Sequence, residues 1–131
     1  MAVIASGGEH GKRLEQLLCG CTHYHEAAER IRSMGAESVV LSLGSRGAVG
    51  AYRDGLIEAV PPRVDALCPI GAGDALTAAY SWATQKKSNP VDALRWGVAA
   101  GTASARLPGM SFATLQQTQE IYKQVEVKRV E

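Results

Sequence analysis

The stretch Pro69-Ile70-Gly71-Ala72-Gly73-Asp74-Ala75-Leu76 combines two glycines and an acidic residue with the start of an apolar run. The apolar positions in and after it that would share one helix face are Ala75, Leu76, Ala79, Tyr80 and Ala83. This spacing is typical of an amphipathic helix. We therefore expect a tight turn that opens a helix running from Gly73 to about Gln85.

The same turn has the features of an anion site. Gly71 and Gly73 lack a Cβ atom, so their φ angles can be positive and a ligand can approach the backbone closely. The first N–H groups of a helix have no internal partner and carry partial positive charge, which suits phosphate. Asp74 would repel an anion unless it has a task, such as accepting a proton from an attacking hydroxyl. The alternative is an ordinary helix start stabilised by Asp74, and residue types alone leave both readings open.

Composition indicates a folded protein of ordinary character. The chain has 131 residues, 46% of them hydrophobic, and a net charge of +1. This length suffices for one domain with a core, and the charge gives no reason to expect nucleic acid as a partner. No apolar run is long enough to span a membrane, and residues 1–6 lack the pattern of a signal peptide. Three cysteines without framework spacing favour a reducing compartment, so we expect a cytoplasmic protein.

Short apolar runs predict strands at Val3-Ile4-Ala5 and from Ser38 to Leu43. The dipeptide Asp54-Gly55 separates runs from Ala48 to Arg53 and from Leu56 to Val60, which predicts a β-hairpin. Strands that alternate with helices early in the chain, followed by helices at its end, indicate the α/β class.

Capping residues predict the remaining helices. Thr22 is a candidate N-cap for a helix that ends before Gly35. Asn89-Pro90 predicts a helix that continues to about Arg106. Thr114 and Gln117 form a capping box for a last helix. The residues expected to face inward there are Leu115, Ile121, Tyr122 and Val125.

Four possible metal ligands alternate with other residues, at Cys19, Cys21, His23 and His25. In a strand, neighbours on one face would lie roughly 6.6 Å apart, too far for four ligands to share one ion. Only a turn could gather them. The pattern leaves two readings open, a metal site in such a turn and a plain loop that leads into a helix.

Several segments, in order, resemble the C-terminal part of the ribokinase-like (PfkB) sugar kinases. They are Ser42-Leu43-Gly44-Ser45-Arg46-Gly47-Ala48, Val60-Pro61-Pro62-Arg63-Val64, Gly71-Ala72-Gly73-Asp74, Arg95-Trp96-Gly97-Val98-Ala99-Ala100-Gly101-Thr102-Ala103 and Thr118-Gln119-Glu120-Ile121-Tyr122. The last is similar to the branch of minor 6-phosphofructokinases, 1-phosphofructokinases and tagatose-6-phosphate kinases. In the family, the Val60–Val64 segment is the strand that leads to the signature.

The resemblance implies a set of site residues. Asp74 would be the catalytic base, and the backbone amides of Ala72 and Gly73, with that of Asp74, would form an anion hole after Gly71. The residues implied to border the nucleotide phosphates are Ser42, Gly44 and Gly47. Those implied to line the adenine pocket are Val98, Ala99 and Gly101.

The implied cofactors are ATP and Mg²⁺, with a sugar phosphate as the other substrate. Two departures weigh against magnesium-dependent catalysis by this chain. His10 and Arg13 fall where the family has the Asn and Glu of a magnesium-supporting motif, and Pro69 takes the place of a small polar residue, often Thr. Cys68 beside it is expected to be a packed core thiol rather than a nucleophile, because no His lies near it in the sequence.

The resemblance implies that residues 1–131 are a single partial ribokinase-like domain, a small sheet with a β-hairpin packed by helices. We expect the ATP-site part of a sugar-phosphate kinase that is inactive alone. The alternative is a non-catalytic nucleotide- or anion-binding module, or a gene remnant. An isolated half of a larger sheet would expose an edge and apolar surface, so we also expect a homo-oligomer.

Overall fold

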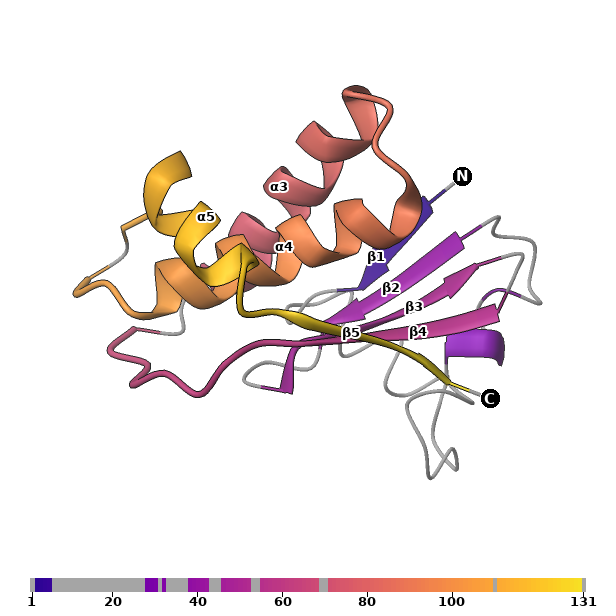
Figure 1. Ribbon diagram of the computed structural model, residues 1–131, viewed down its shortest axis with the longest axis horizontal. Helices are drawn as coiled ribbons and strands as arrows, with labels where there is room; N and C mark the ends of the chain where they lie inside the picture. Colours follow the sequence, from indigo (N-terminus) through magenta and orange to yellow (C-terminus); the bar gives the residue numbers. More distant parts are fainter. Residues whose placement is uncertain are drawn as a thin grey trace.

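The protein is described by a computed structural model for residues 2–5, 28–30, 32, 38–42, 46–52, 55–68, 71–109 and 111–130. The strands are β1 (Ala2–Ala5), β2 (Ser38–Ser42), β3 (Ala48–Tyr52), β4 (Gly55–Val60) and β5 (Glu126–Val130). The helices that the structure describes from end to end are α3 (Ala72–Gln85), α4 (Pro90–Ala105) and α5 (Leu115–Tyr122). These helices lie together on one face of the sheet (Figure 1). The expected α/β class is confirmed.

The strands form one sheet in the order β1-β2-β3-β4-β5, with β1 parallel to β2 and the other neighbours antiparallel. The predicted early strand and the hairpin are both present. Ser42 pairs with Ala48, and Ala48 pairs with Ala59. The end of β2, the start of β3 and the end of β4 therefore lie at the same edge of the sheet.

Two expectations about the strands are wrong. The strand that the resemblance implied from Val60 to Val64 is absent, since β4 ends at Val60, as the apolar run from Leu56 to Val60 predicted, and residues 61–68 form no strand. Pro61 and Pro62 lack the N–H group that a sheet ladder needs. The expected helical end of the chain is also wrong, because β5 follows α5 and pairs with β4.

Capping chemistry sets the starts of α4 and α5 as predicted. The Asp92 N–H donates to the Asn89 side chain at 2.7 Å. The Gln117 N–H donates to Thr114 Oγ1 at 3.2 Å, and the Thr114 N–H donates to Gln117 Oε1 at 2.8 Å, which completes the capping box. One detail differs, because Leu115 does not face inward. Its side chain is 56% exposed, since the buried side of this short helix is formed by Thr118 and Ile121.

The core lies between the sheet and the helices. Its largest fully buried side chains are Leu94, Ile121, Val40 and Val98. Val39 and Val49 are also fully buried, but they alternate with core residues along their strands and lie on the opposite face of the sheet. The predicted apolar face of α3 is buried at Ala75, Leu76, Tyr80 and Ala83. Of the helix expected after Thr22, the structure describes residues 28–30 and 32, where Ala28 is fully buried.

A buried tyrosine pair joins the sheet to the helices. The hydroxyl of Tyr52 on β3 lies 3.2 Å from that of Tyr80 on α3 and donates to the Pro90 carbonyl at 3.3 Å. Burial, together with the hydrogen bond to Tyr80, raises the pKa of Tyr52 well above its usual range. Tyr52 therefore stays neutral, and its contacts with Tyr80 and Pro90 fix the end of the hairpin against the α3–α4 connection.

Gly47 fits the edge of the sheet because it has no side chain. Its φ is +96°, and a Cβ atom there would lie 2.0 Å from the Ala59 carbonyl oxygen. Gly55, in the hairpin, also has a positive φ of +133°, but a Cβ atom there would meet nothing within 4 Å. A side chain at position 47 would therefore meet both backbone strain and a steric clash, whereas one at position 55 would meet the strain alone.

We predict that Gly47→Ala lowers the free energy of unfolding by about 3 kcal/mol, because strain and overlap add. Gly55→Ala brings the strain alone and is expected to cost about 1 kcal/mol. Urea unfolding followed by circular dichroism measures both. Equal losses in the two variants would contradict the role given to the Ala59 contact.

Candidate functional site

The turn formed by Gly71, Ala72, Gly73 and Asp74, the signature turn, opens α3 in the way the sequence predicted. Gly71 is the N-cap residue, with φ of 87°, and its carbonyl accepts the Ala75 N–H at 3.0 Å. No side chain caps this end of the helix. The N–H groups of Ala72, Gly73 and Asp74 precede the first helical hydrogen bond and so have no partner within the helix.

The chemistry available at this turn is anion binding next to a carboxylate. Three successive amide groups at a helix start, with the positive end of the helix dipole, can bind a phosphate group. Asp74 lies in the first turn and is exposed to solvent. A carboxylate in this place can accept a proton from a hydroxyl that approaches the bound phosphate.

Helix α4 contacts both flanks of the turn. Before it, the N–H groups of Leu67 and Cys68 both donate to the Ala105 carbonyl, at 2.9 and 3.1 Å. After it, Gly101 packs so closely on α3 that a Cβ atom would lie 3.0 Å from the Ala72 carbonyl oxygen. The turn is therefore held by tertiary contacts with the last turns of α4.

The residues implied to border the nucleotide phosphates come from the sheet edge. Ser42 is half-buried at the end of β2, and Gly47 is buried immediately before β3. The chain leaves this same edge through residues 61–68 on its way to α3. Gly44 lies outside the described residues, and contact of Ser42 or Gly47 with a phosphate stays a prediction.

The three residues implied to line an adenine pocket are buried. Val98 and Ala99 are 2% and 0% exposed and belong to the core cluster beneath α4. Gly101 is buried against α3. Packing accounts for all three residue types, and contact between them and adenine stays a prediction.

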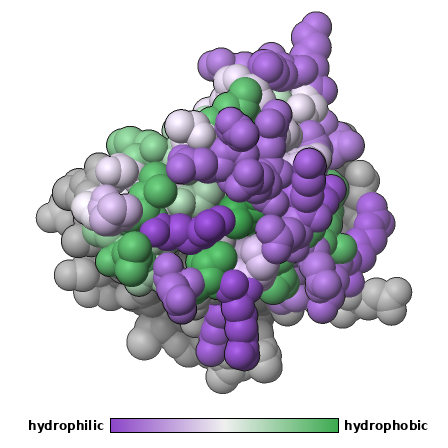
Figure 2. Space-filling model, turned by 60° about the vertical axis from the view of Figure 1, so that its left-hand side comes forward, coloured by the Kyte–Doolittle hydropathy of each residue, from purple (hydrophilic) through white to green (hydrophobic). Residues whose placement is uncertain are grey.

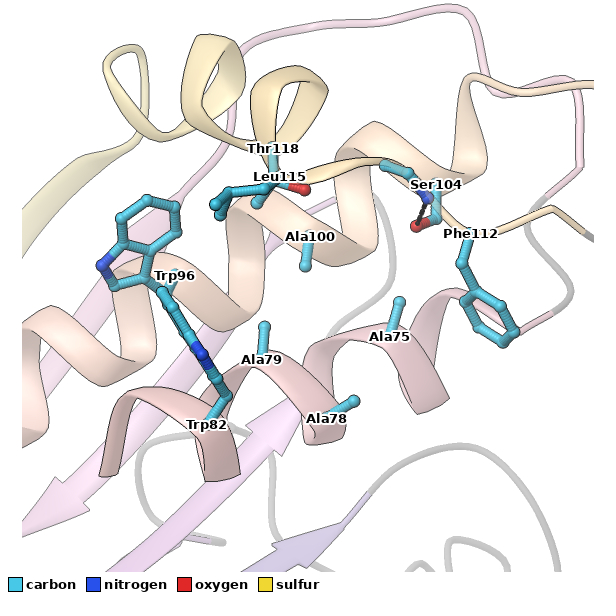
Figure 3. Close-up of a pocket in the computed structure, with 11 residues that line it drawn as sticks. Ala75, Ala78, Ala79, Trp82, Trp96, Ala100, Ser104, Phe112, Leu115 and Thr118 are labelled. Carbon is cyan, nitrogen blue, oxygen red and sulfur yellow. Dashed lines mark hydrogen bonds between the residues drawn. The ribbon is translucent and has the colours of Figure 1, made fainter. Parts of the chain in front are cut away.

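A groove that the sequence did not predict runs between α3 and α4 and past α5 (Figure 3). Its volume is about 320 Å³. It is lined by Ala75, Ala78, Ala79, Trp82, Trp96, Ala100, Ser104, Phe112, Ala113, Leu115 and Thr118. Small residues form its middle, the two tryptophans stand at one end, and Phe112 stands at the end near the start of α3 (Figure 3). The only sequence signal for this groove was a tryptophan in each of two successive helices, Trp82 and Trp96, together with several alanines.

Aromatic contacts stiffen the tryptophan end of this groove. The Trp82 and Trp96 rings meet edge to face, with centroids 5.5 Å apart, and Trp96 stacks on Tyr122 at 4.1 Å. The Tyr122 hydroxyl donates to the Asp92 carboxylate, and burial together with this hydrogen bond raises the pKa of Tyr122. Arg95 donates from Nε to the Tyr122 carbonyl at 2.9 Å. These contacts join α3, α4 and α5.

The structure brings no metal-binding cluster together in the part of the chain that it describes. Cys19, Cys21, His23 and His25, together with His10 and Arg13, lie outside that part. Cys68 is half-buried and does not belong to the buried core, so it is not the core thiol that the sequence suggested. Among the described helices, none has the length and apolar character needed to cross a membrane.

Comparisons with known proteins point to one family. The family described as pfkB family carbohydrate kinase matches residues 15–117. The ATP-dependent 6-phosphofructokinase isozyme 2 of Escherichia coli strain K12 is 35% identical over 96 residues, which are 73% of this chain and 31% of that protein. The chain thus spans about a third of the length of this relative.

Solved structures agree. Phosphofructokinase-2 from Escherichia coli in complex with substrates and products superimposes with a TM-score of 0.78 at 31% identity, over 93% of this chain and 39% of the other. Ribokinase from Thermotoga maritima superimposes with a TM-score of 0.76 at 24% identity, over 86% of this chain and 40% of the other, and so supports the fold alone. The family pattern covers most of the chain and the fold is the same, so this protein belongs to the pfkB family of carbohydrate kinases.

Proposed function

We propose that this chain forms the nucleotide-phosphate part of a kinase that transfers the γ-phosphoryl group of ATP to a hydroxyl of a sugar phosphate. One observation carries the proposal. The start of α3 presents three amides without a helical partner beside the exposed carboxylate of Asp74. This pairing suits a phosphoryl transfer site better than a plain helix start, where the carboxylate would need no glycines around it.

Each group has a distinct task in this proposal. The amides of Ala72, Gly73 and Asp74 bind the oxygens of the transferred phosphoryl group and compensate the charge that develops there. The Asp74 carboxylate accepts the proton of the attacking sugar hydroxyl. Gly71 allows the turn that aims the amides outward, because its φ of 87° is unfavourable for other residues.

The nucleotide would extend from this turn toward the sheet edge. Ser42, Gly44 and Gly47 border its phosphates, and Val98, Ala99 and Gly101 support the wall near adenine. When bound with ATP, Mg²⁺ would neutralise phosphate charge. The described residues contain no group of three or more His, Cys, Asp or Glu side chains that could hold a metal ion.

The proposal treats residues 1–131 as a partial domain that lacks the sugar site. The chain spans 31% of its Escherichia coli relative, and phosphoryl transfer requires both substrates to be held in line. A chain that positions only the phosphate loses most of the catalytic benefit. A non-catalytic phosphate- or nucleotide-binding module is the second candidate, favoured by His10, Arg13 and Pro69 at the places where the family has polar residues that support catalysis.

We predict that inorganic phosphate binds at the signature turn. In an NMR titration the amide resonances of Ala72, Gly73 and Asp74 should shift together and saturate. Asp74→Asn should tighten binding about twofold or more, because a like charge near the anion is removed. Glu120→Gln, at an exposed site on α5, is the matched control and should change nothing. Phosphate shifts confined to other parts of the chain would exclude the site.

We predict that the chain alone has no sugar kinase activity and that Asp74 is essential wherever activity is restored. The assay couples ADP release to absorbance, with fructose 6-phosphate, fructose 1-phosphate and tagatose 6-phosphate as substrates. For restoration, the chain replaces the matching segment of the Escherichia coli relative. There, Asp74→Asn should lower kcat about 100-fold or more, because proton abstraction is lost.

Two results would count against this prediction. Turnover by the unaided chain would show that it carries its own sugar site. Turnover that survives Asp74→Asn in the hybrid enzyme would remove Asp74 from the role of base, while the Glu120→Gln hybrid reports any general effect of charge.

We predict that the chain self-associates. Its sheet has edge strands at β1 and β5, and Leu67, Phe112 and Leu115 are 66%, 64% and 56% exposed. On the face shown in Figure 2, apolar side chains lie among hydrophilic ones. Sedimentation velocity should show oligomers that weaken in Phe112→Ser but not in Gln116→Ser, an exposed polar site nearby. A single monomeric species at all concentrations would refute this expectation.

A further inference from the structure

We infer that Gly101 is a positioning residue, whose lack of a side chain sets the orientation of the Gly73 N–H at the start of α3. This inference rests on the proposed function, because the orientation matters only if that amide binds a phosphate. It assigns Gly101 a task that differs from lining an adenine pocket. The task follows from one close contact between two helices.

The contact joins Gly101 on α4 to the first turn of α3. A Cβ atom on Gly101 would lie 3.0 Å from the Ala72 carbonyl oxygen and 3.6 Å from Leu76 Cβ. The Ala72 carbonyl and the Gly73 N–H belong to one peptide unit, which is planar and rigid. Any movement of that oxygen therefore also moves the Gly73 N–H, the proposed phosphate donor, which points the opposite way within the same planar unit.

Other contacts make α4 the fixed partner in this pair. The Ala105 carbonyl accepts the N–H groups of Leu67 and Cys68, two residues that lie shortly before the signature in the sequence. Ser104 Oγ accepts the Ala113 N–H at 3.0 Å, which fastens the α4–α5 connection (Figure 3). Val98, Ala99 and Ala103 anchor the same helix in the core. An added methyl group at position 101 is therefore relieved by the half-buried start of α3, which no side chain caps, rather than by α4.

The size of the effect follows from the distance. A Cβ at 3.0 Å from a carbonyl oxygen forces a shift of a few tenths of an ångström. A misplacement of 1 Å can cost about 100-fold in the rate of a catalysed reaction. Applied to phosphate binding by the same donor, this scale gives about fivefold for a shift of a few tenths of an ångström. We therefore expect Gly101→Ala to weaken phosphate binding about fivefold.

The chain offers a matched control in Gly97, one helical turn away on α4. A Cβ atom there would lie 3.1 Å from the Leu76 carbonyl oxygen and 3.3 Å from Leu76 Cγ. Gly97→Ala thus adds the same methyl group, at nearly the same distance, to the same pair of helices. It presses on the second turn of α3, whose peptide groups are occupied by helical hydrogen bonds. Both variants gain the same helix propensity from Ala.

The first measurement needs no ligand. Amide chemical shifts of wild type, Gly101→Ala and Gly97→Ala are compared at matched temperature, with thermal unfolding followed in parallel. The inference expects the Gly73 and Asp74 amides to shift in Gly101→Ala and to stay unchanged in Gly97→Ala. Unchanged turn amides in Gly101→Ala, or equal shifts in both variants, would overturn it.

The second measurement adds inorganic phosphate. Binding should weaken about fivefold in Gly101→Ala and less than twofold in Gly97→Ala. Equal weakening in the two variants would show a general packing effect and overturn the inference. If wild type itself binds no phosphate at the turn, the proposed function fails, and the ligand-free shifts still test the positioning by Gly101.

Discussion

The close packing of α4 on α3 is the constraint on which the rest of this structure depends. Gly97 and Gly101 bring α4 against the backbone of α3. A Cβ atom on either glycine would lie only 3.1 or 3.0 Å, respectively, from a carbonyl oxygen of α3. That approach lets α4 bury one side on the sheet and hold α3 with another. The tyrosine pair at positions 52 and 80 closes the far end of the same assembly. Loosening the helix pair would therefore disturb both the core and the signature turn.

Much of the fold could be predicted because its signals are local. Asp54-Gly55 specifies a hairpin, Asn89-Pro90 starts α4, and the Thr114 capping box starts α5. Each of these depends on side chains or backbone angles within a few residues, so the sequence contains the whole cause. The start of α3 at Gly71 belongs to the same group, because a positive φ at a helix entrance selects glycine.

The failures concern structure that distant residues determine. Segment Glu126–Val130 contains three charged residues and shows little strand character alone, yet it pairs along the open side of β4. The end of β4 at Val60 is an exception, because Pro61 and Pro62 cannot donate hydrogen bonds and this local signal predicted it, whereas the resemblance to a known segment implied a strand as far as Val64. Leu115 was assigned to the interior by its apolar character, but α5 is too short to bury both sides.

The candidate site divides along the same line. The amides and carboxylate of residues 72–74 could be read from the sequence, since a helix start generates them. The tasks of Gly47 and Gly101 could not, because each is defined by a carbonyl on another element, Ala59 and Ala72. Val98 and Ala99 are the opposite case, because the resemblance implied a place for them beside adenine while their side chains fill the core. A nucleotide that meets this part of α4 can therefore touch the helix only along its margins, where backbone atoms and half-buried residues such as Thr102 are accessible. Recognition of the base would then depend on shape and on groups from neighbouring segments, while the proposed phosphate contacts would stay with the turn that α4 holds in place.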